Sequence, residues 1–254
     1  SGLQAKNRAS HMLSYAWTAK LVMLQGQICI MTVELNMSEQ PELNGSDSSE
    51  QRRDTKHKKA MEKQKANVDA TVAAADEERG VAILLTGNGK GKSSSAFGMV
   101  MRALGYGYKV GVVQFIKGEM LSGEEIYLKE RYLKEQNPNV VFYQMGTGFT
   151  WDTQDRSGDI AAAKKTWEIS KALLADDSVY LVVLDELTYM LAYDYLDEDE
   201  VLSALKNRPE KQSVVVTGRG GGAKLQAIMD TVSEVKDIKH AFNDGIKARK
   251  GVDF

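Results

Sequence analysis

From Gly80 onward, short apolar runs alternate with longer stretches in which apolar residues recur at helical spacing. The apolar runs predict strands at 81–86, 109–115, 140–145, 180–184 and 213–217. The stretches between and after them predict helices at about 92–104, 123–135, 157–175, 198–206, 222–230 and 241–249. Because unbroken apolar strands alternate with helices, the pattern indicates a mostly parallel sheet with helices on both faces. Residues 80–254 are therefore expected to form an α/β domain that binds its ligands at the carboxyl ends of the strands.

The first 50 residues lack this alternation and are expected to lie outside the domain. Residues 1–12 (SGLQAKNRASHM) are typical of an expression tag. Residues 13–36 contain an apolar run that is too short to span a membrane. A start codon assigned upstream of a natural Met37 explains this run better than a signal peptide, because no clear cleavage site follows it. Residues 37–50 are polar and predict disorder.

Residues 51–79 predict a helical arm between this extension and the domain. Residues 51–65 carry seven Lys and Arg against two Asp and Glu. A solvated amphipathic helix is the favoured interpretation, and an arm for an acidic partner is the alternative.

Composition narrows the functional classes. The formal net charge of −2 argues against a nucleic-acid binder that relies on a broad basic surface. The single cysteine, Cys29, excludes an internal disulfide framework and fits a reducing compartment such as the cytoplasm. That cysteine and the three histidines are scattered, so they give no zinc signature.

The segment VAILLTGNGKGKSSS, residues 81–95, predicts a phosphate-binding loop (P-loop) of the RecA-like class. A predicted strand runs directly into a glycine-rich loop, and a predicted helix follows, which is the context that such a loop requires. Thr86 occupies the position where the usual pattern begins with glycine. A glycine-rich turn that binds nothing is the alternative. The residues expected to contact ATP are Gly87, Asn88, Gly89, Lys90, Gly91, Lys92 and Ser93.

The chemistry of this loop suits a polyphosphate. Its glycines let backbone N–H groups approach phosphate oxygens closely, and the following helix points its positive dipole end at the same anion. Lys92 can place an ammonium group on the phosphates, and Lys90 adds a second cation. The Ser93 hydroxyl is the usual ligand for Mg²⁺ in such loops.

Two further segments follow predicted strands. In YLVVLDE, residues 180–186, Asp185 is expected to hold Mg²⁺ directly or through water, and Glu186 to orient water or metal. A carboxylate that only caps the next helix is the alternative. In TGRGGG, residues 217–222, Arg219 offers a planar fork suited to phosphate. A flexible turn with a solvated arginine is the alternative there.

A loop at 145–154, MGTGFTWDTQ, contains Phe149 and Trp151 among small and polar residues. These aromatic side chains can form a lid or a flat platform for a planar ligand. They can equally fold back into the core, and the residues alone leave both interpretations open.

Taken together, these segments resemble the ATP:corrinoid adenosyltransferases of the bacterial cobalamin pathway, of the P-loop type. The resemblance covers about Glu77 to Phe254. Ser93 stands where the family commonly has threonine, and the stretch YLKERYLKEQNPN looks longer than the usual connection. The stretches that carry the resemblance are TGNGKGKSSSAFG, VGVVQFIKG, GTGFTWDTQ, VVLDELTYMLAYDYL, TGRG and KHAFNDGIKARKG.

The resemblance implies an alkyl transfer in which cobalt(I) of a corrinoid attacks C5′ of ATP and triphosphate leaves. The substrate would be cobalamin or a precursor, in its biosynthesis or salvage. The residues expected to act in the reaction are Lys92, Asp185, Glu186 and Arg219, and Lys90 would add charge at the leaving group. Mg²⁺, or Mn²⁺, would be bound by Ser93 and Asp185.

The resemblance also implies partners. Side chains matching Phe149 and Trp151 are thought to crowd one axial face of the corrinoid and so to favour a four-coordinate cobalt that is easier to reduce. A flavoprotein or reduced flavin would donate the electron, and the enzyme would be a cytoplasmic homodimer with no nucleic-acid or membrane partner. The helix expected within 51–79 would cover the active site when corrinoid is bound.

Two other functions stay open from the sequence. A RecA-like ATPase is the main alternative, because a glutamate after the metal aspartate, here Glu186, often positions an attacking water. A nucleotide-sensing or corrinoid-carrying module without catalysis is the other. The product separates them, since transfer releases triphosphate, hydrolysis releases ADP and phosphate, and a binding module releases neither.

Overall fold

The computed structural model describes residues 23–24, 27–28, 47–116, 122–133, 137–146 and 155–253. The chain divides into two compact units, residues 1–74 and 75–254. The resemblance noted above therefore falls on the second unit.

In the first unit, β1 (Met23–Leu24) pairs antiparallel with β2 (Gln27–Ile28), and α1 (Asp47–Ala73) is a single long helix. The predicted arm spans residues 51–79. The helix begins four residues before the start of that arm and ends six residues before its end. Residues 47–50 are thus helical, whereas the sequence predicted disorder through residue 50. All side chains from residue 49 to residue 73 are exposed. No helix in the described part of the chain is long and apolar enough to cross a membrane.

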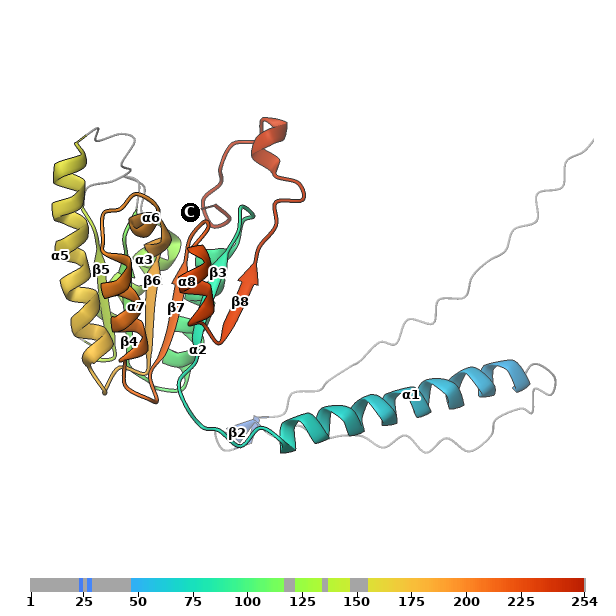
Figure 1. The fold of residues 1–254 in the computed structure, drawn as a ribbon. Coiled ribbons are helices and arrows are strands. Elements are labelled where there is room, and N and C mark those ends of the chain that lie inside the picture. Colours follow the sequence, from blue (N-terminus) through green and yellow to red (C-terminus); the bar gives the residue numbers. More distant parts are fainter. Residues whose placement is uncertain are drawn as a thin grey trace, which may run out of the picture. The chain divides into compact units, whose positions relative to one another are not determined.

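The second unit is built on a six-stranded sheet in which every neighbouring pair is parallel (Figure 1). The strand order is β5-β4-β6-β7-β3-β8. The strands are β3 (Ala82–Thr86), β4 (Val110–Gln114), β5 (Val140–Gln144), β6 (Leu181–Asp185), β7 (Ser213–Thr217) and β8 (Thr231–Glu234). The first five match the predicted strands to within one residue at each end, and the predicted parallel sheet is confirmed.

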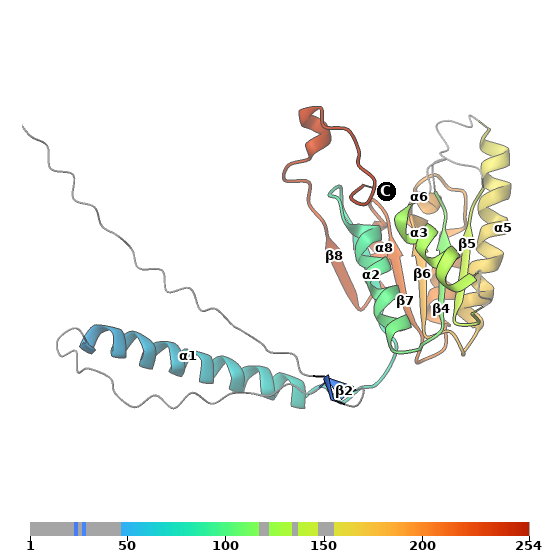
Figure 2. The same cartoon turned by 180° about the vertical axis from the view of Figure 1, so that it is seen from behind.

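Helices cover both faces of this sheet, as predicted. One face carries α2 (Lys92–Gly105), α3 (Gly123–Leu128) and a π-helix (Lys129–Leu133) that continues α3 (Figure 2). The other face carries α5 (Arg156–Ala175), α6 (Leu187–Ala192), α7 (Glu198–Lys206) and α8 (Gly222–Ala227) (Figure 1).

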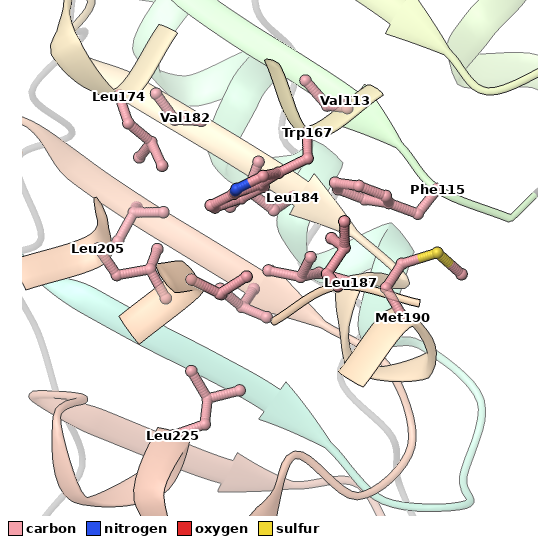
Figure 3. Close-up of a cluster of buried hydrophobic side chains, with 14 of the residues drawn as sticks. Val113, Phe115, Trp167, Leu174, Val182, Leu184, Leu187, Met190, Leu205 and Leu225 are labelled. Carbon is pink, nitrogen blue, oxygen red and sulfur yellow. The ribbon is translucent and has the colours of Figure 1, made fainter. Parts of the chain in front are cut away.

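Alternating side chains along each strand supply the two hydrophobic cores. Leu184 of β6 points into the core beneath α5 to α8, whereas the preceding Val183 points into the core beneath α2 and α3. In the larger core, Trp167 of α5 lies in the same cluster as Leu184 and Phe115 and is 2% exposed (Figure 3). Fully burying an apolar side chain of this kind contributes roughly 1.5–3 kcal/mol, so the apolar strands predicted from the sequence are also what holds the sheet between its helices.

The structure differs from the sequence prediction at three places near the carboxyl end of the chain. The predicted helix at 241–249 is a single 3₁₀ turn, Ala241–Asp244, followed by Gly245 in the left-handed region. Phe242 is 71% exposed and Ile246 is 54% exposed, so the apolar spacing that suggested a helix has no core to pack against. The strand β8 was not predicted, because its sequence TVSE is mostly polar and all four residues are exposed at the sheet edge. The helix predicted at 222–230 ends at Ala227.

Candidate active site

Four neighbouring strands end in a buried polar residue at the same edge of the sheet. These residues are Thr86 of β3, Gln114 of β4, Asp185 of β6 and Thr217 of β7. Parallel strands bring their carboxyl ends together, and the phosphate loop, the acidic pair and the Arg219 loop each follow one of these ends. The sequence therefore placed these three segments at the correct edge.

The phosphate loop leaves β3 and enters α2 through two glycines with positive φ. Gly87 has φ 99° and Gly91 has φ 120°, a region that favours glycine because it has no Cβ atom. A Cβ added at Gly91 would meet no atom within 4 Å, so this glycine is required by backbone conformation and not by crowding.

Gly89 is required for a different reason, since it packs against the segment that follows β8. Its N–H donates a hydrogen bond to the carbonyl oxygen of Val235 at 2.7 Å. A Cβ at Gly89 would lie 2.5 Å from the carbonyl oxygen of Lys236, far inside van der Waals contact. The sequence attributed this glycine to phosphate binding alone. The structure shows that it also lets the loop dock on its neighbour.

The two lysines of the loop have different surroundings. Lys92 is 8% exposed, and its ammonium donates to the carbonyl oxygen of Gly89 at 2.9 Å. Burial lowers the pKa of Lys92, although the nearby carboxylates of Glu186 and Asp185 favour its charged form. Lys90 instead lies 2.9 Å from a carboxylate oxygen of Asp253. Lys92 is therefore the cation held inside the loop.

The remaining polar residues of the loop, Asn88 and Ser93, are more exposed than Lys92. Asn88 is exposed at the tip of the loop, and Ser93 is partly exposed in the first turn of α2. The N-terminal turn of α2 carries no acidic residue. Its N–H groups and dipole therefore favour an anion at this position.

Hydrogen bonds from both neighbouring strands hold the Asp185 carboxylate. Gln114 of β4 donates through Nε2 to Oδ2 at 2.9 Å, and Thr217 of β7 donates through Oγ1 to Oδ1 at 2.6 Å. Gln114 is also the register partner of Asp185 in the sheet. Sequence reasoning missed Gln114 and Thr217. The signal for them was present, because each is a polar residue that closes an otherwise apolar strand.

Glu186 occupies the turn between β6 and α6. Its φ of 61° is left-handed, which is uncommon for a residue other than glycine. Its side-chain oxygen Oε2 is buried, and no hydrogen-bond donor in the described part of the chain reaches it. Burial raises the pKa of Glu186 to about 7, and the neighbouring Asp185 adds to this effect. The carboxyl group is thus held in a site that favours a cation beside it.

Two threonine hydroxyls hold the loop that carries Arg219. Thr188 of α6 donates to the carbonyl oxygen of Arg219 at 2.9 Å, and Thr86 of β3 donates to that of Gly220 at 2.6 Å. Gly218 has φ 136°, and a Cβ there would lie 2.0 Å from the hydroxyl oxygen of Thr188. The loop is therefore fixed to the phosphate-loop strand on one side and to α6 on the other.

The predicted groups Lys92, Glu186 and Arg219 influence one another's charge. The exposed Arg219 lies near enough to Lys92 to disfavour its charged form and near enough to Glu186 to favour the ionised carboxylate. Tyr189 of α6 belongs to the same surroundings, since burial raises its pKa and the Glu186 carboxylate raises it further. Tyr189 also packs against the larger hydrophobic core.

The donor set fits a hard divalent cation. The hydroxyl of Ser93 and the carboxylates of Asp185 and Glu186 are oxygen donors of the kind that Mg²⁺ prefers. The buried oxygen of Glu186 gives a structural reason for a cation here. Within the described residues, no group of three or more His, Cys, Asp or Glu side chains could hold a metal ion.

The predicted aromatic pair, Phe149 and Trp151, lies outside the described residues. The described chain stops at Gly146 and resumes at Asp155, which caps α5 by accepting a hydrogen bond from the N–H of Gly158 at 3.1 Å.

Comparisons with known proteins agree on one family. The profile described as ATP:corrinoid adenosyltransferase BtuR/CobO/CobP matches residues 78–254. A corrinoid adenosyltransferase of Pseudomonas aeruginosa is 54% identical over 202 residues, which cover 80% of this chain and 97% of that protein. A corrinoid adenosyltransferase of Escherichia coli K12 is 49% identical over 201 residues, covering 79% of this chain and 99% of that protein.

Among solved structures, the flagellar accessory protein FlaH from Methanocaldococcus jannaschii is similar with a TM-score of 0.39 and 12% identity. That match covers 62% of this chain and 71% of FlaH, and it is too weak to bear on function.

Proposed function

This chain belongs to the ATP:corrinoid adenosyltransferase family, and from that premise we propose how its residues carry out the transfer. The enzyme transfers the adenosyl group of ATP to a corrinoid in cobalamin metabolism. The observation that supports the assignment of roles is the convergence of Lys92, Glu186 and Arg219, whose charges act on one another at the carboxyl edge of the sheet.

The reaction requires little covalent chemistry from the protein. The electron pair of cobalt(I) forms a bond to C5′ of ATP, the bond between C5′ and the triphosphate oxygen breaks, and triphosphate leaves with the electron pair of that broken bond. Because the corrinoid substrate is the nucleophile, the protein must mainly align C5′ with cobalt and stabilise charge on the leaving group.

Lys92 and Arg219 are proposed to bind the triphosphate from two sides. Lys92 projects from the start of α2, where backbone N–H groups also face the site. Arg219 is carried on a loop whose backbone is fixed by the two threonine hydroxyls, and its planar fork suits bidentate contact with phosphate oxygens. Lys90 is proposed to exchange its ion pair with Asp253 for an ion pair with the phosphates when ATP binds.

Ser93 and Asp185 are proposed to hold Mg²⁺ or Mn²⁺, with Glu186 orienting bound water. When bound, such an ion would neutralise negative charge on the phosphates and on the departing triphosphate. Asp185 supports this assignment because its two hydrogen bonds fix the carboxylate in one orientation.

The corrinoid side of the site is proposed from the sequence. Phe149 and Trp151 would crowd one axial face of the corrinoid, and the helix within 51–79 would cover the bound ligand, in a homodimer. A reduced flavin or flavoprotein would supply the electron that yields cobalt(I). A single cysteine and a strongly reduced cobalt both suit a cytoplasmic location.

Anaerobic incubation with ATP, Mg²⁺ and chemically reduced cobalamin tests the proposal. We expect a light-sensitive cobalt–carbon product and an equal amount of triphosphate. Omitting the reductant is the control and should abolish both. Release of ADP and phosphate at the same rate with or without corrinoid would instead support the RecA-like ATPase, which the comparisons do not favour.

A further inference from the structure

Thr217 connects the two acidic residues of the site through one hydroxyl group. Its oxygen donates to the Asp185 carboxylate at 2.6 Å and accepts a hydrogen bond from the backbone N–H of Glu186 at 2.9 Å. The side chain is fully buried at the end of β7, one residue beyond the last register pair of β6 and β7, Leu184 with Val216. A single side chain thus contacts both members of the acidic pair.

This position requires a group that can donate and accept at once. A hydroxyl does both, whereas a methyl group of the same shape does neither. Replacing Thr217 by an apolar residue would leave the Asp185 oxygen and the Glu186 N–H without this partner. Leaving buried polar groups unpaired is costly, so these groups would reorient.

Glu186 is the residue whose backbone conformation depends most on the Thr217 hydroxyl. Its backbone is in the left-handed region at φ 61°, which other contacts must stabilise. The hydrogen bond from its N–H to Thr217 is one such contact. A relaxed turn would redirect the carboxyl group, whose oxygen Oε2 is now buried without a hydrogen-bond donor among the described residues.

We propose that Thr217 is a positioning residue for adenosyl transfer, which fixes the Asp185 carboxylate and the Glu186 turn so that the metal–nucleotide complex binds in one orientation. The proposal rests on the proposed metal role of Asp185. Gln114 holds the other oxygen of Asp185 at 2.9 Å, so the two strands that flank β6 share the task.

Three variants test the role of Thr217. Thr217→Val removes both hydrogen bonds at nearly constant shape, and Thr217→Ser retains the hydroxyl. Thr166→Val is the matched control, because Thr166 is equally buried on α5 and its hydroxyl donates to the carbonyl oxygen of Ala162 at 2.8 Å, outside the site. The measurements are Mn²⁺ affinity in the presence of ATP, followed by the electron paramagnetic resonance of free Mn²⁺, and kcat and KM with reduced cobalamin.

Loss of a residue that orients a metal ligand typically weakens metal binding or activity by about 10- to 100-fold. We expect Thr217→Val to weaken Mn²⁺ binding to the ATP complex and to lower kcat within that range, with KM for cobalamin nearly unchanged. Thr217→Ser should remain within about threefold of the wild type, and Thr166→Val should alter neither quantity.

Mn²⁺ affinity equal in the wild type and in Thr217→Val would overturn the role of Thr217. A serine variant as impaired as the valine variant would also overturn it. If the valine variant does not fold, Thr217→Cys replaces it, with an expected loss between those of serine and valine; unchanged Mn²⁺ affinity in that variant would count against the proposal. If the wild-type protein with ATP binds no Mn²⁺, the proposed metal site itself is wrong.

Discussion

At the scale of single residues, the two lysines of the phosphate loop show how structure separates similar side chains. The sequence assigned both to the phosphates. In the structure, Lys92 is buried against Gly89, whereas Lys90 is 40% exposed at its side chain and pairs with Asp253. Their removal is therefore expected to have different consequences.

Lys92→Ala should remove the buried cation that anchors the leaving triphosphate. Losing one key electrostatic donor costs about 2–4 kcal/mol of transition-state stabilisation, which lowers kcat/KM by roughly 30- to 1,000-fold. Lys90→Ala is the control, and we expect a smaller loss because Lys90 is partly exposed and already has a carboxylate partner. Steady-state kinetics with reduced cobalamin measure both. Near-normal kcat/KM in Lys92→Ala would refute its role.

Trp151→Ala tests the corrinoid side of the site. If Trp151 helps to make cobalt four-coordinate and reducible, the variant should lose far more activity with cobalt(II) and a weak reductant than with cobalt(I) prepared beforehand. Parallel assays with the two cobalt states give the ratio. Equal losses in both would mean that the side chain only shapes binding.

The choice of site residues predicted from the sequence has a physical explanation. Lys92, Asp185 and Arg219 were predicted because charged groups beside apolar strands and glycines are conspicuous. Gln114 and Thr217 were missed because an uncharged polar residue at a strand end usually has no functional role. Whether it has one depends on which strands are its neighbours in the sheet. Strand order is a long-range property that local patterns do not contain.

At the scale of elements, the edge strand β8 supports the phosphate loop. The loop residue Gly89 packs on Val235 and Lys236, directly after this strand. The sequence did not predict β8, because a sheet edge that faces solvent needs no apolar run. Polar exposed edges are therefore the part of this fold that hydrophobic patterning could not predict.

Gly89→Ala should destabilise the protein through this packing. The added methyl group would meet the carbonyl oxygen of Lys236 at 2.5 Å, and forcing extra atoms into a packed site costs typically 1–3 kcal/mol. Gly98→Ala is the matched control in the middle of α2, where a Cβ meets no atom and alanine should stabilise by about 0.5–1 kcal/mol. Denaturant unfolding without nucleotide measures both. Unchanged stability with weakened ATP binding would indicate that Gly89 serves only the phosphates.

Asp230 fastens the start of β8 to the start of β3. Its carboxylate accepts hydrogen bonds from the Ala82 N–H at 2.7 Å and from the Arg79 guanidinium at 2.8 Å. The bond from Arg79 holds the pKa of Asp230 below its ordinary value. The carboxylate therefore stabilises the fold above the ordinary aspartate pKa of 3.8, and this contribution disappears as pH falls through the lower pKa of the folded state.

Asp230→Asn should accordingly destabilise the protein at neutral pH. Hydrogen bonds to charged groups contribute about 1.5–3 kcal/mol, and asparagine retains only part of this. The difference from the wild type should shrink as the pH falls below about 4 and through the lower pKa of the folded state, where the aspartate itself becomes protonated. Thermal unfolding across pH provides the measurement, with the exposed Asp177→Asn as control. A difference that is constant across pH would contradict the assignment to charge.

At the scale of the whole molecule, the chain consists of a packed α/β unit and an N-terminal unit of another character. The side chains of α1 described by the structure, residues 49–73, are exposed, so this part of the helix lacks the burial that usually stabilises helices in proteins. Charge and composition predicted a solvated helix here. The predicted boundaries of the N-terminal arm, at residues 50 and 79, remain predictions. No hydrophobic core marks where such an arm begins or ends, so composition alone defines them loosely.

Hydrogen exchange tests whether residues 51–79 cover the bound ligands. Without ligand, we expect rapid exchange in this segment, because few buried contacts oppose local opening. Addition of ATP and corrinoid should slow it if the segment orders over the site. Peptides from the central strand β6 should stay protected throughout and serve as the internal reference. Unchanged exchange in 51–79 would count against the cover.

The ion pair between Lys90 and Asp253 has a practical side for anyone preparing this enzyme. Residues joined directly after Phe254 would begin next to Asp253, whose carboxylate contacts the phosphate loop through Lys90. If the phosphate loop binds ATP as proposed, a purification handle at that end would lie close to the nucleotide, and kinetic constants are better measured without it. Handles are better attached upstream of the long exposed helix.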